Sequence, residues 1–453
     1  MIEEWVLDDP DTLARADASG ALLDLASAGA VVRNAVRLAG EAGLDRLRPE
    51  GRPRAVLVAG HGTAALAGDA LAALVGGACP ITVLRPSGTD DSAFRSIDFT
   101  SGLLWSVPGW AGPSDLLVVL SATGTEPGLT SLIEQAYVHG CTVVVVAPVD
   151  SPLSEAALQT RGLPLPYAPS PFAPDPAADP STGAVAPVPA SRPRGLTDRD
   201  LPRDTPSSFW GLLAPAVALA HRIGLITTPS SLQTVADRLD EVAVRCRPGA
   251  ETYGNPAKTL AVQLDGVLPL LWSDGPCTEL AARRFARMLV DQAGRPALQG
   301  TLPDALATQR GLLTSRPADE DEDDFFRDRT EEPDSLRLKV LLLHRTQYLD
   351  QLADQRTGEE RQGDAHPADP TAAGPGPTGP DTAGLPASRR VLARARALAT
   401  DHRISLDELS SGHADSFEAM AELVALTDFA AVYLGLASSG AADVPAGTAP
   451  RDG

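Results

Sequence analysis

The chain has 453 residues, enough for two or three domains of ordinary size. Its 59 acidic residues outnumber its 38 lysines and arginines, and the resulting formal net charge of -21 repels nucleic acids and anionic membranes. The N-terminus lacks the basic start and apolar stretch of a signal peptide, and no run of about 18 apolar residues is evident, so we expect a soluble cytoplasmic protein with no nucleic-acid or membrane partner.

The first part of the chain alternates short apolar runs with helical patterns. A leading helix is expected at about residues 17–43. Between residues 54 and 150 the runs RAVLVAG, PITVLR, DLLVVLS and CTVVVVAP are too evenly apolar for a half-solvated antiparallel sheet. With helix-length stretches between them, they predict repeated βαβ units and a doubly wound parallel sheet. We assign residues 1–161 to a first domain.

A proline-rich stretch interrupts this pattern at residues 162–206, where fixed φ angles and missing donors disfavour helix and interior strand. It predicts a linker. Residues 207–440 form the second domain, which starts with two helices up to Cys246. A second βα series follows, with VLPLLW, RPALQG and LRLKVLLLHR as candidate strands.

Three later segments have solvated or biased compositions. The acidic run Ala318–Asp324 and the low-complexity insertion 354–390 bury too little apolar area to order themselves, so we expect both to be mobile. The last ordered element is predicted to be a helix through FEAMAELVALTDFAAVYLGLAS, and the tail 441–453 is expected to fray.

The cysteines give no metal or redox signal. Cys79, Cys141, Cys246 and Cys277 are far apart, with no CxxC pair and no histidines at metal-ligand spacing. Buried free thiols are the expected state, and the sequence indicates neither a metal nor a cofactor.

A glycine-containing turn follows the first predicted strand. In GHGTAALAGD, Gly60 and Gly62 allow close backbone approach, and the exposed N–H groups of the next helix suit an anion. The spacing is not the dinucleotide GxGxxG pattern. An ordinary strand-to-helix turn is the alternative explanation.

A hydroxyl-rich turn follows a later strand. In SATGTEPGL, the side chains of Ser121, Thr123 and Thr125 can donate to phosphate oxygens together with the backbone around Gly124. The carboxyl ends of strands in open α/β sheets are where ligands bind. By itself, however, such a turn is more often a helix N-cap.

Taken together, GHGTA and SATGTEP resemble the two phosphate loops of sugar-phosphate-isomerase (SIS) domains, GxGxS and SxSGxTxE. Two later segments, NPAKTLAVQLDGVLPLLWSDG and TDFAAVYLGLASSGAADV, resemble parts of bifunctional phosphoglucose/phosphomannose isomerases. The resemblance spans nearly the whole chain apart from the insertions. It implies two SIS-type αβα subdomains, a sugar-phosphate ligand held by the residues named above, and a homodimer.

The positions implied to be catalytic depart from that family. The base glutamate of NENAKxPA corresponds to Asp291 in VDQAGRPA, one methylene shorter, and the histidine position is Ala307. The family's C-terminal lysine is missing, since no lysine follows Lys339. His344 and His413 lie elsewhere, and a lone histidine is more often structural or solvated than catalytic.

The phosphate anchor departs as well. Ala64 replaces the first loop's serine, and Glu126 replaces a threonine that would donate to phosphate. An ionised carboxylate beside a dianion is unfavourable. Either Glu126 turns outward, or the ligand is not an ordinary sugar phosphate.

These departures leave two main hypotheses. In the first, the protein keeps the fold and binds a sugar phosphate or related carbohydrate derivative with lost or weakened turnover. In the second, it is an active isomerase that converts glucose 6-phosphate or mannose 6-phosphate to fructose 6-phosphate, with Asp291 as the base. A transcription regulator is a remote third option, because no helix-turn-helix pattern or positive field supports it.

Overall fold

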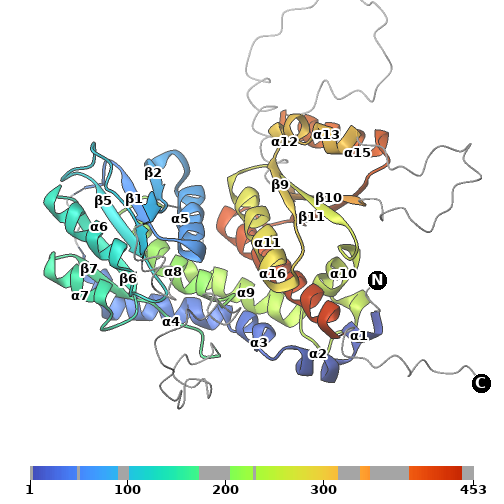
Figure 1. The fold of residues 1–453 in the computed structure, drawn as a ribbon, viewed down its shortest axis with the longest axis horizontal. Helices are drawn as coiled ribbons and strands as arrows, with labels where there is room; N and C mark the ends of the chain where they lie inside the picture. Colours follow the sequence, from blue (N-terminus) through green and yellow to red (C-terminus); the bar gives the residue numbers. More distant parts are fainter. Residues whose placement is uncertain are drawn as a thin grey trace, which may run out of the picture. The chain divides into compact units, whose positions relative to one another are not determined.

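The computed structural model describes residues 4–47, 51–89, 102–172, 205–227, 231–314, 337–346 and 387–440 (Figure 1). The chain forms two compact units, Trp5–Asn255 and Pro256–Gly453, the latter including Met1–Glu4. Each unit is built on its own parallel sheet.

The first unit contains a five-stranded parallel sheet in the order β2-β1-β5-β6-β7. Its strands are β1 (Val56–Ala59), β2 (Ile81–Leu84), β5 (Leu116–Leu120), β6 (Thr142–Ala147) and β7 (Leu163–Pro166). The central strands β1 and β5 are buried along their whole length, which explains their unbroken apolar sequences. The short strands β3 (Gly88–Thr89) and β4 (Leu103–Leu104) form a separate antiparallel pair.

Helices cover both faces of this sheet. On one face, α6 (Pro127–Val138) and α7 (Pro152–Gln159) share a core with alternate residues of β1, β5 and β6. On the other, α5 (Gly62–Val75) packs on β1 and β2, and α8 (Ser208–Arg222) packs on α5 and β6. The unit is therefore a helix–sheet–helix sandwich.

The described part of the first unit contains five further helices. They are α1 (Glu4–Asp8), α2 (Pro10–Ala16), α3 (Ala21–Ala26), α4 (Ala28–Glu41) and α9 (Leu232–Arg245). The carboxylate of Asp24, which is buried, accepts hydrogen bonds from the Ser207 amide (2.7 Å) and hydroxyl (2.6 Å). This contact fixes the start of α8 to α3. Short 3-10 turns lie at Leu44–Arg46, Gly76–Ala78 and Thr252–Gly254.

The second unit contains a four-stranded parallel sheet in the order β11-β10-β8-β9. The strands are β8 (Leu268–Ser273), β9 (Leu298–Thr301), β10 (Leu338–Arg345) and β11 (Ser405–Ser411). One face packs against α12 (Asp304–Thr308), α13 (Arg310–Thr314) and α15 (Ala387–Asp401). The other is covered by α11 (Pro276–Ala293) and α16 (Ser416–Gly440), and α10 (Pro256–Gln263) packs on α16.

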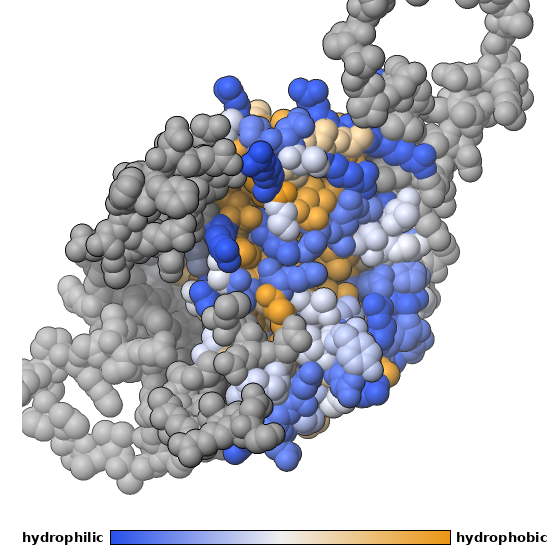
Figure 2. Space-filling model, turned by 90° about the vertical axis from the view of Figure 1, so that its right-hand side faces the viewer, coloured by the Kyte–Doolittle hydropathy of each residue, from blue (hydrophilic) through white to orange (hydrophobic). Residues whose placement is uncertain are grey.

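The helix α16 carries apolar side chains on most of its circumference, and most of it lies inside its unit. Within the described residues, Ser416–Ser438 is the one stretch long and apolar enough to cross a membrane, but 89% of that window is buried in the protein. Its apolar side chains are used in packing against α10 and α11. On the face of the molecule in Figure 2, hydrophilic residues predominate and enclose smaller apolar patches, as the net charge leads one to expect.

The predicted fold class, α/β with two doubly wound parallel sheets, is confirmed. The units divide between Asn255 and Pro256, however, whereas the proline-rich stretch predicts a boundary at 162–206. The reason is that α8 and α9 pack on α4 and α5 of the first unit. In addition, LPLP at the start of the predicted linker forms β7, which as an edge strand needs fewer donors.

Several predicted features lie wholly or mostly outside the described residues. These are the remainder of the linker, the acidic run 318–324, nearly all of the insertion 354–390 and the tail 441–453.

A buried ion pair joins α11 to α16 and allows a stability test. Arg284 and Asp428 are almost fully buried, with Nη2 and Oδ2 2.7 Å apart. We expect Asp428→Ala to lower the free energy of unfolding by about 3–5 kcal/mol, because it deprives a buried guanidinium of this counter-charge. Urea denaturation followed by circular dichroism measures this. Glu41→Ala, which removes the exposed pair with Arg37, is the control and should change little.

Candidate functional site

The strand order of the first sheet places a topological switch point between β1 and β5. These strands are neighbours in register, from Val56 beside Leu116 to Ala59 beside Val119. The chain leaves β1 towards β2 on one side and leaves β5 towards β6 on the other. Loops diverge at such a switch point, which is where open α/β sheets bind ligands.

Two glycines allow the loops at this point to pack closely. A Cβ at Gly60 would lie 2.8 Å from the Ala64 Cβ and 3.0 Å from the Leu120 carbonyl oxygen. Gly124 has a φ of +72°, and a Cβ there would lie 2.5 Å from Ser151 Oγ. Gly62 is the first residue of α5. The predicted glycine loop therefore follows β1 and lies directly beside the hydroxyl loop, which follows β5.

The hydroxyl loop encloses the carboxylate of Glu126. Ser121 Oγ lies 2.8 Å from both Oε1 and Oε2 of Glu126, and Thr123 Oγ1 donates to Oε1 over 2.8 Å. His61 Nε2, from the loop after β1, lies 3.2 Å from Oε1. Only 1% of Glu126 is exposed. The side chain therefore turns inward and occupies the position that the hydroxyls surround.

Backbone amides complete this arrangement, which we call the Glu126 cradle and define as His61, Ser121, Thr123, Gly124 and Glu126. The Gly124 amide donates to Ser121 Oγ over 2.7 Å, and the Thr123 amide does so over 3.2 Å. The Ser121 hydroxyl can thus direct its own proton towards the carboxylate. Of the predicted phosphate-binding residues, Ser121, Thr123 and Gly124 belong to the cradle, whereas Thr125 lies outside it and is exposed.

The cradle favours a negative charge. Burial by itself raises the pKa of the Glu126 carboxyl, but the hydrogen bonds with His61, Ser121 and Thr123 outweigh it and hold the pKa below its ordinary value of 4.5. Glu126 also precedes the first residue of α6, where the helix dipole favours an anion. At neutral pH the cradle therefore holds an ionised carboxylate supplied by the chain itself.

His61 is the cradle residue that the sequence did not identify. It lies between the two glycines of GHG, and the motif alone does not distinguish a histidine that faces the neighbouring loop from one that faces solvent. Only the pairing of β1 with β5 brings it next to Glu126.

The other predicted positions belong to the second unit. Asp291 is exposed near the end of α11, and its Oδ2 accepts a hydrogen bond from Gln292 Nε2 over 2.7 Å. Ala307, at the family's histidine position, lies in α12. Of the two lysines, Lys258 is buried and Lys339 pairs with Asp407 over 2.6 Å.

The four cysteines are free and buried, as predicted. Among the described residues, no group of three or more His, Cys, Asp or Glu side chains could hold a metal ion.

Removal of the buried charge gives a pH-dependent stability prediction. We expect Glu126→Gln to lower the free energy of unfolding at pH 7 by about 1–3 kcal/mol, because charge-assisted hydrogen bonds are lost in a buried site. Since the folded-state pKa lies below the unfolded value, this contribution is fully present above about pH 4.5 and is lost as the pH falls through the folded-state pKa.

Urea denaturation of both proteins between neutral and acidic pH tests this. The exposed Glu155 on α7 provides the matched control Glu155→Gln, for which we expect almost no difference from the wild type. An equal loss of stability in Glu126→Gln at every pH would contradict the assignment.

Comparison with known proteins adds a family to this geometry. Residues 254–357 match the family model for the bacterial phospho-glucose isomerase C-terminal SIS domain. No curated protein matches the sequence significantly.

Solved structures resemble the chain at low sequence identity. A hypothetical protein from Thermus thermophilus has a TM-score of 0.56 and 12% identity, covering 95% of this chain and 89% of its own. A glucose-6-phosphate isomerase like protein from the same organism has 0.44 and 17%, covering 95% and 92%. The C-terminal domain of glucosamine-fructose-6-phosphate aminotransferase from Francisella tularensis has 0.48 and 10%, covering 92% and 96%.

The first of these structures has the same overall fold. Together with the parallel sheets, the matching family model confirms the resemblance to the SIS-type family predicted from the sequence: residues 254–357 are similar to the bacterial phospho-glucose isomerase C-terminal SIS domain.

Proposed function

We propose that this protein binds a sugar phosphate or a related carbohydrate derivative, and that its isomerase activity is lost or greatly weakened. The observation that carries the proposal is the Glu126 cradle. Hydroxyls and amides suited to an anion gather at the switch point of the first sheet, and a carboxylate of the chain already fills them.

This arrangement weakens the binding of a phosphate without abolishing the site. Two unit charges 4 Å apart repel each other by about 4 kcal/mol at an effective dielectric constant of about 20. A phosphate dianion must therefore displace the Glu126 carboxylate from Ser121 and Thr123 or bind beside it. Both routes cost binding energy that a threonine at position 126 would not require.

The residues at the two positions expected to be catalytic, Asp291 and Ala307, also support a loss of isomerase activity. Aldose–ketose isomerisation needs a base to move a proton between adjacent carbons and a group to open the sugar ring. Ala307 has no group for proton transfer, and Asp291 is one methylene shorter than the family's glutamate. A shift of about 1 Å in a base can cost roughly 100-fold in rate.

An active isomerase is the second candidate, because the carboxylate of Asp291 is exposed and so accessible. In either case we place the protein in the cytoplasm as a homodimer, in keeping with the family resemblance.

A coupled assay separates the two candidates. Glucose 6-phosphate and mannose 6-phosphate are offered separately, and fructose 6-phosphate is measured for the wild type and for Asp291→Asn. We expect no turnover above background in either protein, because the proton-transfer groups are altered. Wild-type turnover that Asp291→Asn abolishes would instead establish the isomerase with Asp291 as its base.

Removal of the Glu126 carboxylate tests whether the cradle binds phosphate. We expect Glu126→Thr to bind glucose 6-phosphate at least about tenfold more tightly than the wild type in isothermal titration calorimetry, since the repulsion disappears and a hydroxyl is added. Adding Ser121→Ala should remove that gain, and Glu155→Gln should bind as the wild type does. Unchanged or weaker binding by Glu126→Thr would rule out the cradle as the phosphate site.

A further inference from the structure

The second sheet repeats the strand order of the first. Written in the same sense, the orders are β9-β8-β10-β11 and β2-β1-β5-β6. In each sheet the chain passes from a central strand to one neighbour and later returns to the other side. The second sheet therefore has its own switch point between β8 and β10, where a ligand site is expected on topology alone.

Polar residues meet at that second switch point. Asp274 is the first residue after β8, and His344 is the next-to-last residue of β10. Leu343 pairs with Ser273 in the parallel register, so the next residue on each strand, His344 and Asp274, lie level with each other. Neighbouring strands are about 4.8 Å apart.

The imidazole of His344 is held in place through its Nε2 atom, which lies 2.9 Å from Oε2 of Glu408 on β11. Glu408 in turn accepts two hydrogen bonds from Arg396 of α15, from Nε to Oε1 over 2.6 Å and from Nη2 to Oε2 over 2.8 Å. These bonds from Arg396 lower the pKa of Glu408, which stays ionised and accepts a hydrogen bond from the Nε2–H group of His344. A ring anchored in this way has a fixed tautomer.

The other nitrogen of this ring is unsatisfied. His344 is only 6% exposed, and its Nδ1 is buried with no hydrogen-bond partner among the residues that the structure describes. A ring that carries its single proton on Nε2 presents Nδ1 as an acceptor. A buried polar atom without a partner costs about 1–3 kcal/mol, so its persistence here points to a partner from outside this part of the chain.

The carboxyl group of Asp274 adds further hydrogen-bonding positions beside Nδ1 of His344. The Asp274 carboxylate accepts hydrogen bonds from Thr278 Oγ1 over 2.9 Å and from the backbone of Arg345, which still leaves acceptor positions on its two oxygens. Burial raises the pKa of Asp274 above its ordinary value, so its carboxyl group also keeps a proton to higher pH and can then donate. A group that both donates and accepts hydrogen bonds fits beside it.

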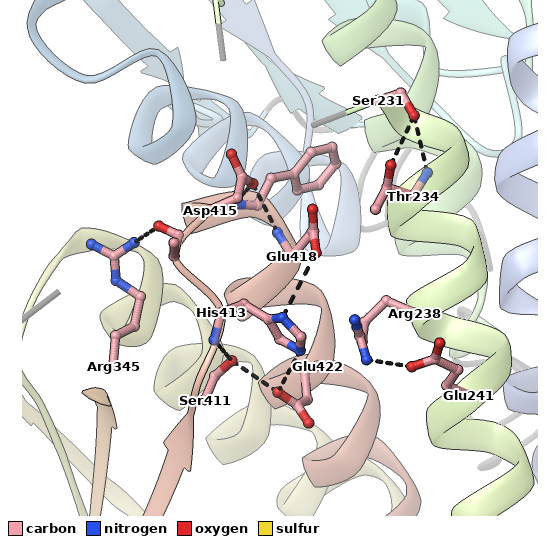
Figure 3. A network of polar contacts seen from close by, with 12 residues as sticks. Ser231, Thr234, Arg238, Glu241, Arg345, Ser411, His413, Asp415, Glu418 and Glu422 are labelled. Carbon is pink, nitrogen blue, oxygen red and sulfur yellow. Dashed lines mark hydrogen bonds and ion pairs between the residues drawn. The ribbon is translucent and has the colours of Figure 1, made fainter. Parts of the chain in front are cut away.

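The charges at this edge disfavour an anion. Arg345 (Figure 3) is directed to the start of α16, where its Nη1 donates to Ser416 Oγ over 2.7 Å. His413 lies between Glu418 and Glu422, at 3.8 and 3.4 Å, and Ser411 Oγ donates to Glu422 over 2.8 Å. The nearby guanidinium and imidazole groups are thus engaged with the chain's own acceptors. An uncharged ligand that carries hydroxyls suits this surface better than a phosphate.

We propose that the switch point between β8 and β10 is a second binding site, which takes the adjacent hydroxyl groups of an uncharged carbohydrate. One hydroxyl donates to Nδ1 of His344, and its neighbour exchanges hydrogen bonds with the carboxyl group of Asp274. This site belongs to the second unit and does not depend on the Glu126 cradle.

A titration of the full chain with neutral sugars tests the proposal. The probes are D-glucose, D-mannose, D-fructose and methyl α-D-glucopyranoside, and the signal is the ¹⁵N resonance of His344 Nδ1 in protein labelled at histidine. We expect at least one probe to shift this resonance saturably at millimolar concentrations. If none of the four does so, the proposal is wrong, whether or not sugar phosphates bind the first unit.

The variant His344→Gln sharpens the test. The glutamine amide can still donate to Glu408, but it has no counterpart of Nδ1. We expect affinity for the active probe to fall at least about tenfold, the size of one lost hydrogen bond. His402→Gln, at an exposed histidine of the same unit, should keep wild-type affinity. Equal binding by His344→Gln overturns the assignment, and if that variant does not fold, the wild-type titration decides alone.

Discussion

The contact between the Glu126 carboxylate and the hydroxyls of Ser121 and Thr123 is the constraint on which the first unit depends. A carboxylate buried this completely would be strongly destabilising without these donors and His61. Its position in turn requires that β1 and β5 be adjacent, that Gly60 allow close approach and that Gly124 adopt a positive φ. One interaction therefore links the strand order, the loop sequences and the charge of the site.

The same contact gives a physical reason for the proposed function. A cradle of hydroxyls and amides is useful to an enzyme when the anion comes from the substrate and leaves with the product. Here the anion is the side chain of the residue just before α6, so its effective concentration is very high and it competes with every ligand. Alanine at position 307 and an aspartate at position 291, one methylene shorter than the family's glutamate, agree with the proposed loss of turnover.

The two sheets place different chemistry on equivalent topology. After β1 and β5 come glycines, hydroxyls and an internal carboxylate, a set that suits an anion. At the ends of β8 and β10 lie an aspartate and an anchored histidine whose Nδ1 has no partner among the described residues, a set that suits hydroxyl groups. Fold and function are separable in this way because the strands supply the position while the loop residues supply the chemistry.

The sequence alone determined the fold class, most of the strands, several of the helices, and the glycine and hydroxyl loops, because unbroken apolar runs and turn residues are local signals. It did not predict β11, whose alternating sequence SLDELSS is half solvated, or the boundary at Asn255, which depends on the packing of α8 against α5. It left the direction of Glu126 open and gave no sign that His344 lies level with Asp274. These features depend on which strands become neighbours, and pairing between segments about 60 to 70 residues apart is decided only when the sheet forms.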